Sequence, residues 1–76
     1  MTDQIESRIT IEPGKMGGRP GIRGLRIRVI DILDMLAEGA SRADILESYP
    51  ELEDEDITAA LAYARRAIDH RVIAAE

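Results

Sequence analysis

The stretch RITIEPGKMGGRPGIRGLRIRV, residues 8–29, decides the fold of this 76-residue chain. It holds five of the six glycines and two of the three prolines, residue types that favour tight turns. Residues 8–12 and 25–29 alternate apolar and polar side chains, which is typical of half-buried strands, and Ile22-Arg23 fits a further short strand. We therefore predict a β-hairpin or meander over residues 8–28. It must pack on other elements, because two strands alone are marginal in water.

Four residues of this stretch are predicted to set its loop geometry. Gly17 and Gly18 permit positive φ angles, Pro20 holds the residue before it extended, and Gly24 marks a turn. A phosphate-binding loop would need its glycines to run directly into a helix N-terminus. Gly24 lies five residues before the next predicted helix and no Gly-Lys-Ser/Thr sequence follows. We therefore predict a shaped hairpin and no cofactor.

Two amphipathic helices are predicted next. Residues 29–38 form the first, because the chain places apolar side chains at helical spacing on one face: Val29, Ile32, Leu33 and Leu36. Gly39 is placed to end this helix. The second helix runs from residue 42 to about residue 48. Ser41 caps its start, and Asp44 completes a capping box.

The third predicted helix starts near Glu53 or Asp54 and reaches about residue 70. Its inner stripe consists of Ile57, Ala60, Leu61, Ala64 and Ile68. The expected fold is thus mainly α, in the α+β class: a short N-terminal β-hairpin followed by a three-helix, helix-turn-helix-like (homeodomain-like) bundle. Residues 1–76 are expected to form a single domain, with residues 1–7 flexible, 29–70 helical, and 71–76 a tail that fits helix or strand equally.

Composition limits the classes of function. Residues 1–28 carry six basic and three acidic side chains, whereas residues 29–76 carry four basic and twelve acidic ones. This acidity disfavours non-specific nucleic-acid binding. The chain has no cysteine, no run long enough to span a membrane and no signal-peptide pattern, so we expect a cytoplasmic protein. Its small aliphatic core favours a homodimer or a subunit stabilised by a partner.

Several segments together resemble a known family. These are GGRPGIRGLRIRV at 17–29, the apolar helix ending at Gly39, the Ser-capped helix, YPEL at 49–52 and ALAYA at 60–64. Over about residues 8–64 the chain resembles the small prokaryotic proteins catalogued as domain of unknown function 433. The resemblance implies a helix-turn-helix-like domain and an antitoxin encoded beside a PIN-like nuclease toxin. The chain departs from the family pattern at Leu25, Arg28 and Glu53, where Thr, Pro and Thr are common.

Basic side chains of the hairpin are the candidate partner- or anion-binding residues: Lys15, Arg19, Arg23, Arg26 and Arg28. They could form a solvated face, bind phosphates through the forked guanidinium, or enter an acidic pocket on a protein partner. PIN-like nucleases hold their metal with clustered carboxylates, so an inserted arginine would compete for that charge. We favour protein binding, or mixed use of these residues, over pure DNA binding.

The start of the third helix would be the recognition end in a DNA-reading helix-turn-helix. Residues 53–56 are all acidic and would be repelled by phosphates, which leaves Thr58, Arg65 and Arg66 as possible DNA-facing residues. No catalytic set and no metal-ligand cluster is recognisable, so we expect no enzyme. The predicted function is an antitoxin-like protein that neutralises a PIN-like toxin and represses its own operon. The alternative is a helix-turn-helix regulator that binds operator DNA without a toxin partner.

Overall fold

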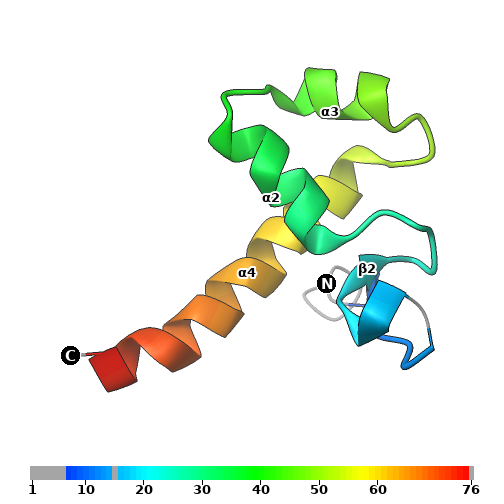
Figure 1. The fold of residues 1–76 in the computed structure, drawn as a ribbon. Coiled ribbons are helices and arrows are strands. Elements are labelled where there is room, and N and C mark those ends of the chain that lie inside the picture. The colour runs from blue at the N-terminus through cyan, green and yellow to red at the C-terminus, as the bar shows by residue number, and fades with distance from the viewer. Residues whose placement is uncertain (1–6, 15, 76) are drawn as a thin grey trace.

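The fold is a small β-hairpin followed by three helices, as seen in the computed structural model (Figure 1). The structure describes residues 7–14 and 16–75, with side chains described for residues 7–14 and 17–69. The elements are β1 (Ile9–Thr10), the 3-10 turn η1 (Met16–Gly18), β2 (Gly21–Ile22), α2 (Val29–Ala37), α3 (Arg42–Ser48) and α4 (Asp54–Ala75). The predicted mainly α, α+β fold class is confirmed. The flexibility expected of residues 1–7 falls largely on residues 1–6, which lie outside the described residues.

The hairpin is shorter than the alternation of side chains predicted. Strand β1 pairs antiparallel with β2, with Ile9 opposite Ile22 and Thr10 opposite Gly21. The strand predicted over residues 25–29 is wrong, since Arg28 forms only an isolated bridge with Gly21. A tight turn directly follows β2.

Arg23 and Gly24 form the centre of that turn. Both have positive φ angles, 47° and 72°, which is the pattern of a type I′ turn. The turn is closed by the N–H of Leu25, which donates to the Ile22 carbonyl at 2.7 Å. The chain then returns beside β2, where the N–H of Ile22 donates to the Ile27 carbonyl at 2.9 Å and the N–H of Val29 donates to the Pro20 carbonyl at 3.0 Å. Ile27 is nevertheless buried. The alternation over residues 25–29 therefore predicted correctly that Ile27 faces the core, but not the secondary structure.

All three helices begin in the same way. An aspartate at the third helical position accepts a hydrogen bond from the backbone N–H of the residue before the helix. The pairs are Arg28 N to Asp31 at 2.9 Å, Ser41 N to Asp44 at 2.9 Å and Glu53 N to Asp56 at 2.8 Å. Each carboxylate thus satisfies a donor just outside the helix and lies at the positive end of the helix dipole. The predicted Ser41–Asp44 capping box is confirmed.

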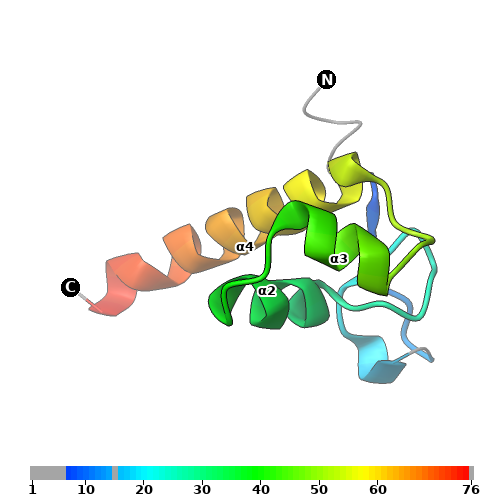
Figure 2. The same ribbon diagram turned by 90° about the horizontal axis from the view of Figure 1, so that it is seen from above.

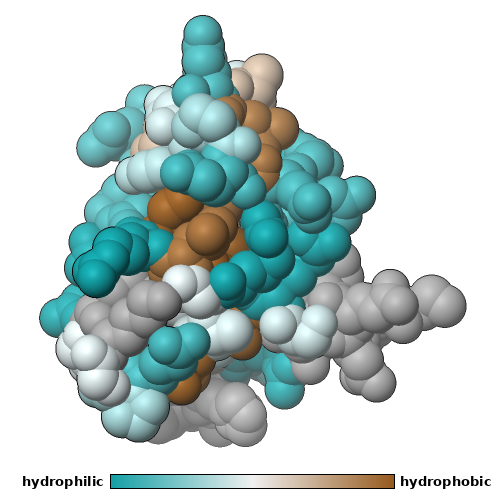
Figure 3. All heavy atoms as spheres, turned by 90° about the vertical axis from the view of Figure 1, so that its right-hand side faces the viewer, coloured by the Kyte–Doolittle hydropathy of each residue, from teal (hydrophilic) through white to brown (hydrophobic). Residues whose placement is uncertain are grey.

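The core lies where α2, α3 and β1 pack against the first half of α4. Its buried members are Ile22, Ile27, Val29, Ile32, Ile45, Leu52, Ile57 and Ala60. Figures 1 and 2 show the second half of α4 extending beyond the other elements. On the face seen in Figure 3, hydrophobic atoms gather mainly near the centre and are flanked by hydrophilic ones. The inner stripe predicted on the third helix is split: Ile57 and Ala60 are buried, but Leu61 is 41% and Ile68 58% exposed.

Gly39 ends α2 in a Schellman motif. Its φ angle is +98°, its N–H donates to the Leu36 carbonyl at 3.0 Å, and the N–H of Ala40 donates to the Met35 carbonyl at 3.0 Å. Both bonds satisfy carbonyls that the end of the helix leaves without intrahelical partners.

Replacing Gly39 by alanine is therefore expected to lower the free energy of unfolding by about 1–2 kcal/mol, because an L-residue is strained at this φ. The measurement is urea denaturation followed by circular dichroism. The control is Gly14→Ala, where an added Cβ meets no atom within 4 Å and the change should stay within about 0.5 kcal/mol. Equal losses in both variants would contradict the assignment.

Candidate functional site

A buried carboxylate at the start of α4 forms ion pairs with two arginines of the hairpin. Asp56 has a fully buried side chain, and Arg23 binds it with both arms, Nε to Oδ1 at 3.0 Å and Nη2 to Oδ2 at 3.0 Å. Arg8 adds Nη1 to Oδ1 at 2.9 Å. The same carboxylate accepts the N–H of Glu53. We call Arg8, Arg23 and Asp56 the Asp56 clasp.

The surroundings of the clasp hold each arginine in place. Arg8 also donates to Glu53 Oε1 at 2.8 Å, and Arg23 Nη2 donates to the Glu51 carbonyl at 2.9 Å. Burial alone would raise the pKa of Asp56. The hydrogen bonds from Arg23, from the Glu53 backbone and from Arg8 outweigh that effect, so the pKa lies below its ordinary value. The clasp therefore links the hairpin to α4 through charged groups, and both carboxylate oxygens of Asp56 accept hydrogen bonds.

The five basic candidates of the hairpin do not share one outward face. Arg23 belongs to the clasp, and Arg28 is paired with Asp31 at 2.7 Å. Lys15 lies outside the described residues. Arg19 and Arg26 are exposed, and no ion pair joins either to another described residue. Of the candidates with described side chains, only these two remain available to a partner.

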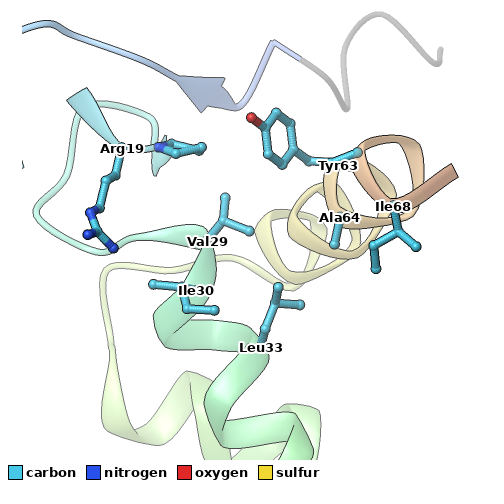
Figure 4. A pocket seen from close by; sticks show the side chains of 9 residues that line it. Arg19, Val29, Ile30, Leu33, Tyr63, Ala64 and Ile68 are labelled. Atoms are coloured by element: carbon cyan, nitrogen blue, oxygen red, sulfur yellow. The ribbon is translucent and has the colours of Figure 1, made fainter. Parts of the chain in front are cut away.

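Arg19 lies at the edge of an apolar groove of about 340 Å³ between α2 and α4 (Figure 4). The groove is lined by Arg19, Pro20, Val29, Ile30, Leu33, Tyr63, Ala64, Ala67 and Ile68. A second hollow, of about 540 Å³, continues along α4 and is lined by Leu33, Leu61, Ala64, Arg65, Ile68 and Asp69. Leu33, Ala64 and Ile68 line both hollows, and together with Ile30 of the first and Leu61 of the second we call them the α2–α4 face.

The three possible DNA-facing residues, Thr58, Arg65 and Arg66, are all exposed on α4. The Thr58 hydroxyl accepts a hydrogen bond from Arg42 Nη2 at 2.6 Å, and Arg42 also pairs with Asp54 at 2.8 Å. Arg65 borders the second hollow, and Arg66 is exposed one residue later. Thr58 is thus engaged within the chain, about two helical turns from the arginines.

Two features were missed from the sequence. The sequence shows Asp56 only as one of four acidic residues at the start of the third helix, although its place three residues after Glu53 marks a capping position. The inner stripe predicted on that helix includes Leu61 and Ile68, which are exposed, because the stripe continues well past the length of the first helix. Among the described residues no three acidic, histidine or cysteine side chains converge to hold a metal ion. No helix in the described part is long and apolar enough to cross a membrane.

Comparison with known proteins gives three matches. The model of a family described as "Protein of unknown function (DUF433)" matches residues 9–64. The uncharacterized protein y4eO of Sinorhizobium fredii is 39% identical over 56 residues, which are 74% of this chain and 25% of that protein. The chain therefore spans about a quarter of this curated relative. The crystal structure of a DUF433 member from Anabaena variabilis superposes with a TM-score of 0.79 at 34% identity, covering 95% of this chain and 73% of that one.

Removing the carboxylate of the clasp is expected to destabilise the fold. Asp56→Ala leaves two arginines without their buried partner and should lower the free energy of unfolding by about 3 kcal/mol. Asp54→Ala is the matched control, since Asp54 lies in the same helical turn but pairs with Arg42 at the surface, where loss of a pair costs about 1 kcal/mol or less. Urea denaturation of both variants makes the comparison. Similar midpoints would show that the clasp adds no more than a surface ion pair.

The lowered pKa of Asp56 also predicts a pH dependence. The folded carboxyl binds its proton more weakly than the unfolded one, so the stabilisation is complete above the unfolded pKa, about 3.9. It is lost as the pH falls through that value toward the folded pKa. Asp31, Asp44 and Asp54 have lowered pKa values as well and act in the same direction. Denaturation at a series of pH values should show constant stability above about pH 5 and a decline below about pH 4; stability that rises on acidification would contradict this.

Proposed function

The chain belongs to the family described as protein of unknown function DUF433, and on that premise we propose that it is an antitoxin-like protein that binds and neutralises a PIN-like nuclease. The observation that carries the proposal is the pair of exposed arginines, Arg19 and Arg26, on an otherwise acidic chain. The formal net charge is −5. Two outward cations on an acidic body suit one local acidic target better than an extended polyanion.

The chemistry of the target fits these arginines. A nuclease that holds metal ions with clustered carboxylates presents concentrated negative charge at its active site. A guanidinium offers a planar fork that matches a carboxylate and keeps its charge at all physiological pH values. Arg19 has an apolar groove beside it, so a partner segment could bury hydrophobic surface next to the ion pair. We place this encounter in the cytoplasm, where the sequence predicts the protein to be.

DNA binding through the start of α4 receives less support. Glu51, Glu53 and Glu55 are exposed there and would face phosphates with like charge. Thr58, the polar side chain best placed after them, already binds Arg42. We therefore assign any repression of the operon to a complex with the toxin, whose own surface would contribute to the DNA contact.

The test is co-expression of the chain with the product of its adjacent reading frame. The two proteins are expected to co-purify, and the chain to suppress the partner's RNA cleavage. The double variant Arg19→Ala/Arg26→Ala should bind at least about tenfold more weakly, because arginines at interface centres are energetic hot spots.

The matched control is Arg65→Ala/Arg66→Ala, which removes the same amount of charge from α4 and should bind the partner like the wild type. Equal weakening in both double variants would mean that net charge, not the hairpin arginines, governs binding. Full binding by the hairpin variant would refute the role of Arg19 and Arg26.

For autoregulation, the complex should retard the upstream promoter fragment at physiological salt; retardation by neither complex nor free chain would remove that part of the proposal.

A further inference from the structure

Strand β1 lies at an open edge of the small sheet. Its pairing with β2 sets Ile9 opposite Ile22, and the N–H of Ile22 donates away from β1, to the Ile27 carbonyl at 2.9 Å. Ile9 and Ile22 are therefore a non-hydrogen-bonded pair, so the N–H and C=O of Ile9 point away from β2. The other side of β2 is occupied by the returning chain, where Gly21 forms a bridge with Arg28. Within the described part of the chain, no hydrogen bond uses the outward N–H and C=O of Ile9.

This edge continues to Ile11 and is apolar there. Continued by one residue, the register of β1 and β2 sets Ile11 opposite Pro20. Because the direction of the backbone groups alternates along an extended chain, the N–H and C=O of Ile11 point outward like those of Ile9. The side chain of Ile11 is 56% exposed. Proteins usually protect a free strand edge with charged residues, proline or a covering element, so an exposed isoleucine at this edge marks a place where another strand can pair.

We propose that β1 pairs with the β1 of a second copy, antiparallel about a two-fold axis at Thr10. The sequence Ile9-Thr10-Ile11 is the same in both directions, so this axis sets Ile9 of each copy opposite Ile11 of the other. Each such pair exchanges both backbone hydrogen bonds, and the exposed Ile11 packs beside the partner's Ile9 on the same face of the sheet. One segment supplies both sides of the contact, as a two-fold interface requires.

The residues on either side of this segment favour the antiparallel direction. Arg8 precedes it and Glu12 follows it. The two-fold register sets Arg8 opposite the partner's Glu12, whereas a parallel, in-register pairing would set Arg8 opposite Arg8 and Glu12 opposite Glu12. Like charges directly opposite each other destabilise a strand pair. Arg8 keeps its bonds to Glu53 and Asp56, so the charges set the direction and the backbone bonds supply the contact.

The clasp orders β1 before any partner binds. Arg8, the residue directly before Ile9, donates to Asp56 at 2.9 Å, and the Thr10 hydroxyl accepts the N–H of Gly24 at 3.1 Å. A strand that is already ordered loses less conformational entropy on association. A second copy brings a strand that its own clasp has ordered, whereas an unstructured peptide must be ordered as it binds. This difference favours the chain's own copy as the occupant of the edge.

The first experiment measures the mass of the full chain by analytical ultracentrifugation. The wild type should sediment at twice the monomer mass of 8.4 kDa. Ile11→Pro removes an outward N–H that the pairing of β1 with β2 does not use, so it should sediment as a monomer with its helical circular dichroism retained. Ile68→Asp is the matched control, since Ile68 is equally exposed, at 58%, but lies on α4, and it should remain a dimer. A monomeric wild type, a dimeric Ile11→Pro variant or a monomeric Ile68→Asp variant would overturn the proposal.

The second experiment tests the register and does not need the proline variant to fold. The chain has no native cysteine, and the axis brings the two Cα atoms of residue 10 to about 4.5 Å in a non-hydrogen-bonded pair, within reach of a disulfide. Thr10→Cys should therefore form a disulfide-linked dimer when oxidised glutathione is the oxidant. Ile11→Cys is the matched control, because each Ile11 faces the partner's Ile9 and lies diagonal to the partner's Ile11.

Ile11→Cys should accordingly stay monomeric on a denaturing, non-reducing gel. Cross-linking of Ile11→Cys as readily as Thr10→Cys would indicate parallel strands or another register and would overturn the proposal, as would a Thr10→Cys chain that does not cross-link. Neither experiment requires the nuclease, so their outcome is independent of the proposed function.

Discussion

The position of the hairpin depends on the carboxylate of Asp56. Its two oxygens accept hydrogen bonds from Arg23, from Arg8 and from the backbone of Glu53. One buried group therefore starts α4 and fixes the N-terminal element to it. An uncompensated buried charge is strongly unfavourable, so burial of Asp56 requires the two arginines. The hairpin, whose strands have two residues each, is held on the helices by this tie together with the buried side chain of Ile22.

The clasp also determines what the surface can do. Three of the arginines that give the N-terminal stretch its basic charge, Arg8, Arg23 and Arg28, neutralise acids of the helical part. The basic charge of the N-terminal stretch is therefore largely neutralised by ion pairs with the acidic helical part of the same chain. Arg19 and Arg26 remain exposed, and Arg19 borders the apolar groove. In the proposed function these two arginines contact the nuclease.

Periodicity and caps made the helical part predictable. The start of α3 at Ser41–Asp44 and the glycine end of α2 follow from contacts between residues at most five apart, which the sequence displays directly. The alternation over residues 25–29 predicted a strand and gave no sign of the turn at Arg23, which places a non-glycine residue at positive φ. That conformation accompanies the contact between Arg23 and Asp56, 33 residues away, which no local pattern reveals. Because such long-range contacts are not visible in local patterns, the sequence could not show which arginines form ion pairs within the chain and which are exposed.

The shared way in which the helices start has a consequence for the order of folding. Each start is fixed by a bond between residues three apart, so α2, α3 and α4 can each form from local contacts. The bond between Arg8 and Asp56 spans 48 residues, and closing so long a loop carries a larger entropic cost. We expect the hairpin to dock after the helices have assembled, although the hairpin is synthesised before them. Substitution of Arg8 should then mainly speed unfolding, with little change in the folding rate, in stopped-flow kinetics.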